Sequence, residues 1–169
     1  MGSGAKRRVG IAALTGVALG VLAGGAVHAA DRAAVTGVVM PEGYREWVAV
    51  APSHRTDKGH IRMMLANPKM VNAYRAGTLP FPDGSVIAKL VYEAVKSPTW
   101  DGAVVPGEPV IIEFMVKDSA RFPQNKGWGF GRFAPDGTPR GDEALYQTCF
   151  PCHQAQVSDT DYIFTHWAP

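Results

Sequence analysis

The residues best suited to chemistry lie late in this chain of 169 residues, which contains two cysteines. These are Cys149 and Cys152, and His153 follows directly, so the local pattern is C-x-x-C-H. This pattern is the attachment signature of a c-type haem. Two thiols at this spacing can bond to the two vinyl groups of a haem, and the adjacent imidazole can bind its iron. The pattern therefore predicts one covalently attached haem c, with His153 as the proximal iron ligand.

Other sites built from a lone cysteine pair explain this sequence less well. A thioredoxin-like redox pair lies early in a βαβ unit, whereas only 16 residues follow His153. A zinc site needs two further thiolate or imidazole ligands, and the sequence has no second C-x-x-C and no H-x-x-x-H. A structural disulfide between Cys149 and Cys152 stays open as an alternative, but it leaves the adjacent histidine unexplained.

Residues 1–30 have the pattern of a cleaved export signal. Residues 6–8 are basic, residues 9–25 are almost wholly apolar or glycine, and small side chains favour cleavage after Ala29. The apolar run is short for a membrane span of about 20 residues, although an uncleaved anchor stays open. Export agrees with the haem motif, because c-type haem is attached outside the cytoplasm. We therefore expect a periplasmic protein in which residues 31–169 form a single haem domain.

Removal of the signal changes the charge of the chain. It removes three of the 17 basic residues and none of the 15 acidic ones, which leaves a formal charge near −1. This balance gives no reason to expect binding to nucleic acid or to an anionic membrane surface. A mature chain of about 140 residues can bury one hydrophobic core.

The mature sequence predicts an α+β, β-rich fold: an antiparallel sheet with a few short helices and the haem attached near the C-terminus. Frequent Gly and Pro residues divide the chain into short elements. Strands are predicted at residues 44–51, 61–66, 85–95, 109–118 and 127–134. Asn67 followed by a proline predicts a helix at 68–76, and Asp142 predicts the start of a second helix, 142–148, that leads into Cys149.

In two of these strands, the alternation of side chains does not show what certain residues pack against. Lys89 lies in the middle of an otherwise apolar row, between Ile87 and Val91. It either extends to solvent from a surface strand or faces a cofactor. In the strand at 127–134, glycines at alternate positions leave one face without side chains. A neighbouring helix, a partner subunit or the haem could pack against that face.

Five short stretches follow one another along the mature chain. They are residues 44–48 (Y-R-E-W-V), 60–62 (H-I-R), 81–86 (F-P-D-G-S-V) with Lys89 close behind, 149–153 (C-x-x-C-H) and 161–165 (D-Y-I-F-T). In this order they resemble the cytochrome P-460 family. The resemblance spans most of the mature chain. It implies a β-rich subunit, usually in a homodimer, with one c-type haem, a proximal histidine and an open distal face.

The resemblance also implies roles for three residues outside the haem motif. Lys89 matches a lysine whose nitrogen bonds to the porphyrin rim in the hydroxylamine-oxidising members. Arg62 matches an arginine on the distal side of the iron, where a fixed cation can stabilise developing negative charge; its alternative is a solvated strand residue. Glu143 is the nearest match to a distal carboxylate that acts as general base. Its alternative role is to stabilise the N-terminus of its own helix.

Three functions are compatible with these residues. The first is haem-based oxidation of hydroxylamine, with electrons passed to a redox partner cytochrome. The second is binding of nitric oxide or carbon monoxide by a five-coordinate haem, as in the related cytochromes c′-beta, which need neither base nor lysine bond. The third is simple electron transfer, which needs a strong sixth iron ligand. His60, Met63, Met64 and Met115 are candidates, but strand methionines more often fill the core. We therefore do not expect a sixth iron ligand. Of the two remaining functions, we favour the enzyme.

Overall fold

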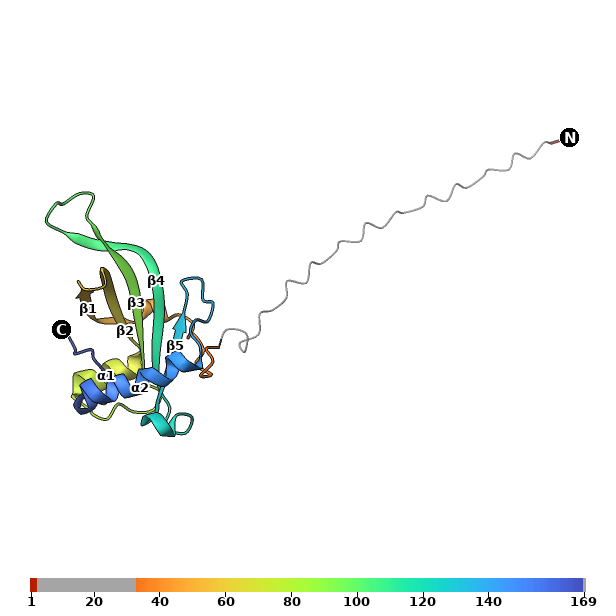
Figure 1. Ribbon diagram of the computed structural model, residues 1–169. Helices are drawn as coiled ribbons and strands as arrows, with labels where there is room; N and C mark the ends of the chain where they lie inside the picture. The colour runs from red at the N-terminus through yellow and green to blue at the C-terminus, as the bar shows by residue number, and fades with distance from the viewer. Residues whose placement is uncertain (3–32, 169) are drawn as a thin grey trace.

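The computed structural model describes residues 1–2 and 33–168, so most of the predicted export signal lies outside the described residues. A five-stranded antiparallel sheet in the order β1-β2-β3-β4-β5 forms the body of the molecule (Figure 1). Its strands are β1 (Val48–Arg55), β2 (His60–Ala66), β3 (Val86–Lys96), β4 (Val104–Lys117) and β5 (Trp128–Phe133). The helices are α1 (Pro68–Ala76) and α2 (Glu143–Val157), with short 3-10 turns η2 (Tyr44–Glu46), η3 (Pro123–Asn125) and η4 (Ser158–Thr160). The predicted α+β, β-rich fold is confirmed.

The helix predicted at 68–76 is α1, with the same bounds. The side chain of Asn67 accepts a hydrogen bond from the backbone N–H of Met70 at 3.0 Å, which satisfies one of the free donors of the first turn. Gly77 ends the helix in the left-handed region, with φ of 62°. These signals act within a few residues of the helix ends, and for that reason they could be recognised in the sequence.

Several predicted elements have different bounds in the structure, and the strand predicted at 109–118 begins five residues earlier, at Val104. The strand predicted from residue 44 begins only at Val48, because Tyr44–Glu46 forms a 3-10 turn. The ring of Tyr44 packs edge-on against Phe114, with ring centroids 5.1 Å apart. The helix predicted to end at residue 148 continues to Val157 and includes the whole C-x-x-C-H motif, with Pro151 inside it.

The two faces of the sheet have different partners. Ala88, Phe114 and Phe133 point to the buried core. The glycines of β5 lie on this same face, because Gly131 pairs with Phe114. A Cβ on Gly131 would lie 2.6 Å from Val38, and one on Gly129 would overlap the ring of Phe122. The chain's own apolar residues therefore cover the glycine face.

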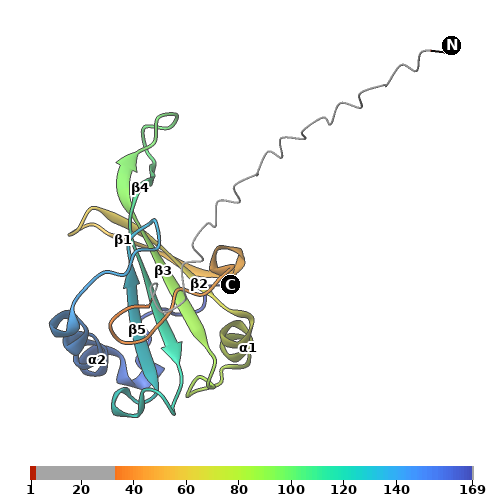
Figure 2. The same ribbon diagram turned by 90° about the vertical axis from the view of Figure 1, so that its right-hand side faces the viewer.

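The two helices lie towards opposite edges of the sheet, with α2 beside β5 and α1 beside β2 and β3 (Figure 2). The hairpin between β3 and β4 extends beyond the rest of the molecule (Figure 1), and Trp100 in its loop is 75 % exposed. Within residues 33–168, neither helix is long and apolar enough to cross a membrane.

We expect Gly129→Ala to lower the free energy of unfolding by about 1–3 kcal/mol, because the new methyl group must displace the ring of Phe122. Gly102→Ala is the control, since the nearest atom to its new Cβ is 3.7 Å away. Chemical denaturation of both variants and the parent protein measures the difference. Equal unfolding free energies for the two variants would contradict the packing described for this face.

Candidate functional site

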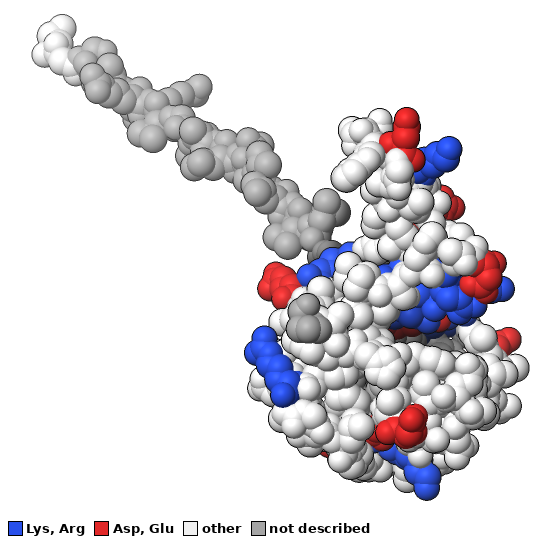
Figure 3. All heavy atoms as spheres, turned by 90° about the vertical axis from the view of Figure 1, so that its left-hand side faces the viewer, with Lys and Arg blue, Asp and Glu red and all other residues white. Residues whose placement is uncertain are grey.

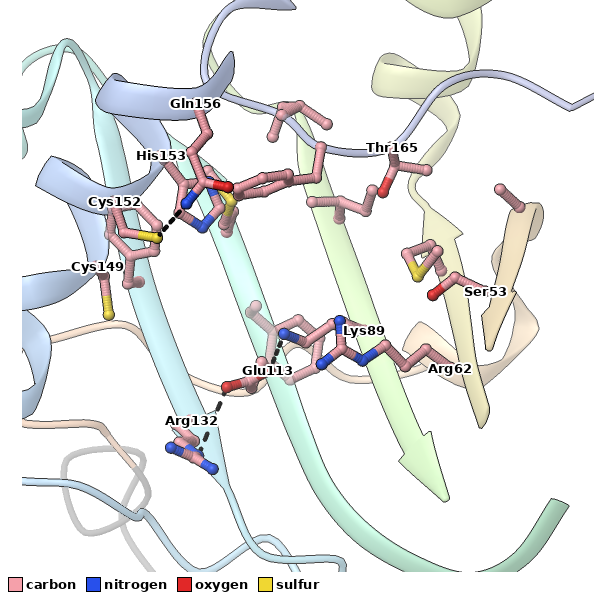
Figure 4. Close-up of a pocket in the computed structure, with 18 of the residues that line it drawn as sticks. Ser53, Arg62, Lys89, Glu113, Arg132, Cys149, Cys152, His153, Gln156 and Thr165 are labelled. Carbon is pink, nitrogen blue, oxygen red and sulfur yellow. Dashed lines mark hydrogen bonds and ion pairs between the residues drawn. The ribbon is translucent and has the colours of Figure 1, made fainter. Parts of the chain in front are cut away.

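A cavity of about 740 Å³ lies on the other face of the sheet. Its walls come from all five strands, from α2 and from residues 163–168 (Figure 4). In Figure 3 basic side chains gather beside a hollow in the molecular surface. The strands supply one wall because residues two apart on a strand point to the same side.

Helix α2 presents the haem-motif residues to this cavity. Cys149, Cys152 and His153 all line it, and both cysteines are free thiols. Residues three or four apart lie on one face of a helix, which brings the three side chains together. Burial raises the pKa of the Cys149 thiol above its ordinary value, whereas Cys152 is exposed.

The ring of His153 is held on three sides. Its Nδ1–H donates a hydrogen bond to the backbone carbonyl of Tyr162 at 2.7 Å. The rings of Phe130 and Phe164 meet the imidazole edge-on, with centroid distances of 5.2 and 4.8 Å. Burial lowers the pKa of His153, which favours the neutral ring. Because a carbonyl can only accept, Nδ1 carries the hydrogen and Nε2 keeps its lone pair.

These residues fit a haem. The cavity combines two free thiols and an imidazole with a free Nε2 lone pair, the donor set that holds a c-type haem. Apolar side chains such as Ile87 and Phe130 supply the walls. Arg62 adds an unusual feature: its Nε is buried and has no hydrogen-bond partner among the described residues. A buried donor of this kind suits an anionic or polar group of a bound molecule.

Lys89 lines the cavity, and its side chain is 35 % exposed. Its ammonium group forms an ion pair with Glu113 on the neighbouring strand β4. Lys89 lies on β3, the central strand, and faces the cavity together with Ile87. The structure therefore places Lys89 at the candidate site. Its bond to a haem stays a prediction.

Glu113 is the site residue that sequence reasoning missed. It lies directly opposite Lys89 on one side and Arg132 on the other. Its Oε1 is 3.5 Å from Nε of Arg132, and its side chain is 27 % exposed. The signal for it was an acidic residue in the otherwise apolar run of residues 110–116. That signal becomes specific only when the pairing of the strands is known.

Arg62 also lines the cavity, from β2. Burial lowers the pKa of its guanidinium, and repulsion from Arg55 acts in the same direction. Among the candidates for a sixth iron ligand, Met64 and Met115 line the cavity, whereas His60 and Met63 do not. The cavity thus gathers the predicted arginine and lysine around the haem motif.

Glu143 is not among the described residues that line the cavity. It is exposed in the first turn of α2, where Asp142 caps the helix by accepting from Leu145 N at 2.9 Å. At about 100° per residue, Glu143 lies roughly 240° around the helix axis from Cys149, so the two side chains leave the helix in different directions. A carboxylate in this position stabilises the helix N-terminus. The structure thus favours the alternative role for Glu143, and the cavity carboxylate is Glu113.

Comparison with known protein families agrees with this geometry. The family model described as Cytochrome P460 matches residues 41–165. This range includes all five strands, both helices and the cavity lining except residues 166–168. No match was found among the curated proteins. A family model that covers most of the chain, together with a cavity that fits a haem, leads to one assignment. The chain belongs to the cytochrome P460 family.

Proposed function

We propose that this protein is an exported, periplasmic c-type haem protein that oxidises hydroxylamine and passes the electrons to a redox partner, and that it acts as a homodimer. The observation that carries the proposal is the cavity in which α2 presents two thiols and His153 beside Arg62 and the ion pair of Lys89 with Glu113. Family membership supports the haem. When bound, the haem supplies an iron centre that can accept electrons from a nitrogen compound.

The haem-motif residues of α2 would hold and orient the cofactor. Cys149 and Cys152 would form the two thioether bonds, and His153 would bind the iron through Nε2. The hydrogen bond to Tyr162 and the two flanking phenyl rings restrict rotation of the imidazole.

Arg62 is suited to stabilise negative charge on a bound substrate. Its Nε–H is already desolvated and has no partner among the described residues, so it would lose little on meeting a substrate oxygen. A guanidinium stays charged at neutral pH even when burial lowers its pKa. It can therefore stabilise an N–O group as its oxygen gains charge.

Oxidation of hydroxylamine releases protons, which need an acceptor in the cavity. Glu113 is the carboxylate placed to accept them, because Glu143 does not line the cavity. Its two ion-pair partners, Lys89 and Arg132, fix the direction of the carboxylate. We propose Glu113 in this role, in place of the residue suggested by the resemblance.

One observation favours the gas-binding alternative. The ammonium group of Lys89 is engaged by Glu113, and an ammonium in an ion pair is not a nucleophile. A protein of the cytochrome c′-beta kind needs no lysine bond and no base. It would hold its haem with the same thiols and imidazole, and would bind nitric oxide or carbon monoxide in the cavity that Arg62 lines.

The double variant Cys149→Ala with Cys152→Ala tests covalent attachment. We expect it to lose the haem stain that the parent protein retains on a denaturing gel, because no thioether bond can form. The variant Cys152→Ala alone should keep a weaker stain through Cys149. A haem that stays attached in the double variant would exclude both cysteines from the linkage.

Lys89→Ala tests the bond between lysine and haem. If the bond forms, the visible spectrum of the ferrous parent protein should show the absorption band that is characteristic of family members with a lysine–haem bond. The spectrum of Lys89→Ala should then be that of an ordinary c-type haem. Mass analysis should find a peptide that contains Lys89 joined to the haem peptide. Lys96→Ala is the control, since Lys96 lies exposed on the same strand. A parent spectrum of the ordinary c type would favour the gas-binding function.

Glu113→Gln tests the proton acceptor and the enzymatic function together. We expect its steady-state rate of hydroxylamine oxidation to fall about 10²–10⁴-fold, because the amide cannot take up a proton. Glu143→Gln should retain nearly the full rate. The reverse order of the two rates would return the role to Glu143, and a parent protein without turnover would reject the enzymatic proposal.

A further inference from the structure

Outside the cavity, the described residues include a buried ion pair between Lys117 and Asp161. Lys117 is the last residue of β4, and Asp161 follows η4. Nζ of Lys117 lies 3.0 Å from Oδ1 and 2.9 Å from Oδ2 of Asp161, and both side chains are only 7 % exposed. Charges so far from water cost desolvation, so the pair adds little to stability relative to apolar residues. A positional role is the better explanation for it.

The surroundings of the pair fix Asp161 relative to the sheet. Lys117 also donates to the carbonyl of Lys126 at 3.0 Å and lies over the ring of Trp128, 4.8 Å from its centroid. Oδ2 of Asp161 accepts a second hydrogen bond, from the backbone N–H of Phe81 at 2.9 Å. Two segments distant in sequence, at Phe81 and at Lys117, thus converge on the Asp161 carboxylate.

The backbone at Asp161 needs such an anchor. Asp161 and the next residue, Tyr162, have φ of 50° and 68°, a left-handed conformation that is unfavourable for residues with a Cβ. This turn directs the carbonyl of Tyr162 to Nδ1 of His153, at 2.7 Å. The anchored carboxylate and the carbonyl that orients the imidazole are therefore on adjacent residues of one strained turn.

The hydrogen bond at Nδ1 determines how strongly a histidine donates electrons to a metal through Nε2. A close acceptor increases the basicity of the imidazole and fixes the plane of its ring. A carbonyl that moves away weakens both effects. Strong donation stabilises the ferric state of a haem iron and lowers its reduction potential.

We propose that the Lys117–Asp161 ion pair positions the Tyr162 carbonyl against His153 and thereby sets the donor strength of the proximal imidazole. Lys117 and Asp161 are then positioning residues, because they act through Tyr162 and do not line the cavity. This inference rests on the haem ligation in the proposed function. It does not depend on hydroxylamine being the substrate.

The test compares the holoprotein with Asp161→Asn. We expect a higher reduction potential and an iron–histidine stretching band at lower frequency in the resonance Raman spectrum of the ferrous protein. Asp161→Asn leaves Lys117 buried without a counter-charge, so the double variant Lys117→Met with Asp161→Asn is made alongside it. The double variant removes both charges and should show the same two shifts. Lys117→Arg keeps the ion pair and should leave both values close to those of the parent.

Met70→Ala is the control for a purely structural effect. Met70 is fully buried in α1, an element separate from the turn at Asp161, so its truncation lowers stability through the core. We expect its potential and its Raman band to match the parent. If the double variant lost stability like Met70→Ala while both readouts stayed at parent values, the proposal would be wrong. If the spectrum of the parent protein showed no histidine-bound haem, the proposed ligation would be wrong. If the protein did not oxidise hydroxylamine, the reduction potential and the Raman band would still decide this proposal.

Discussion

The register of the antiparallel sheet is the constraint on which the rest of the structure depends. It aligns Met64, Lys89, Glu113 and Arg132 as successive cross-strand neighbours. Because side chains alternate between faces, a slip of one residue in β4 would turn the side chain of Phe114 away from the core and that of Glu113 into it. The burial of Phe114 against Tyr44 and Phe133 opposes that slip. The apolar core on one face thus specifies the charged row on the other.

The second half of the site depends on a helix and a turn that lie far from the sheet residues in sequence. Helix α2 supplies the thiols and His153, and the turn after η4 supplies the carbonyl of Tyr162. The ion pair of Asp161 with Lys117 joins this turn to the end of β4. The sheet therefore carries one wall of the cavity and also anchors the segment that orients the opposite wall.

Features that depend on neighbouring residues in the sequence could be predicted. Features that depend on how the strands pair could not. The bounds of α1 follow from Asn67 and Gly77, and the C-x-x-C-H motif can be recognised from its own five residues. Glu113 acquires meaning only beside Lys89 and Arg132, and the strand register that brings them together is not visible in any one strand. Glu143 was the nearest match to the distal carboxylate implied by the resemblance, and it lies six positions before Cys149. The rotation of α2 between them removes it from the cavity.

The charged row also gives the cavity an electrostatic character of its own. Among the described residues that line it, Arg62, Lys89 and Arg132 are basic and Glu113 is acidic, while the lining residue Arg55 is paired with Asp57 outside the lining, so basic side chains outnumber acidic ones in the wall. In a partly enclosed space such a field repels small cations and attracts anions more strongly than it would in open water. An uncharged molecule pays no such electrostatic cost on entry. In the proposed function, this field would favour an uncharged molecule, such as the neutral form of hydroxylamine or a diatomic gas, over a protonated amine.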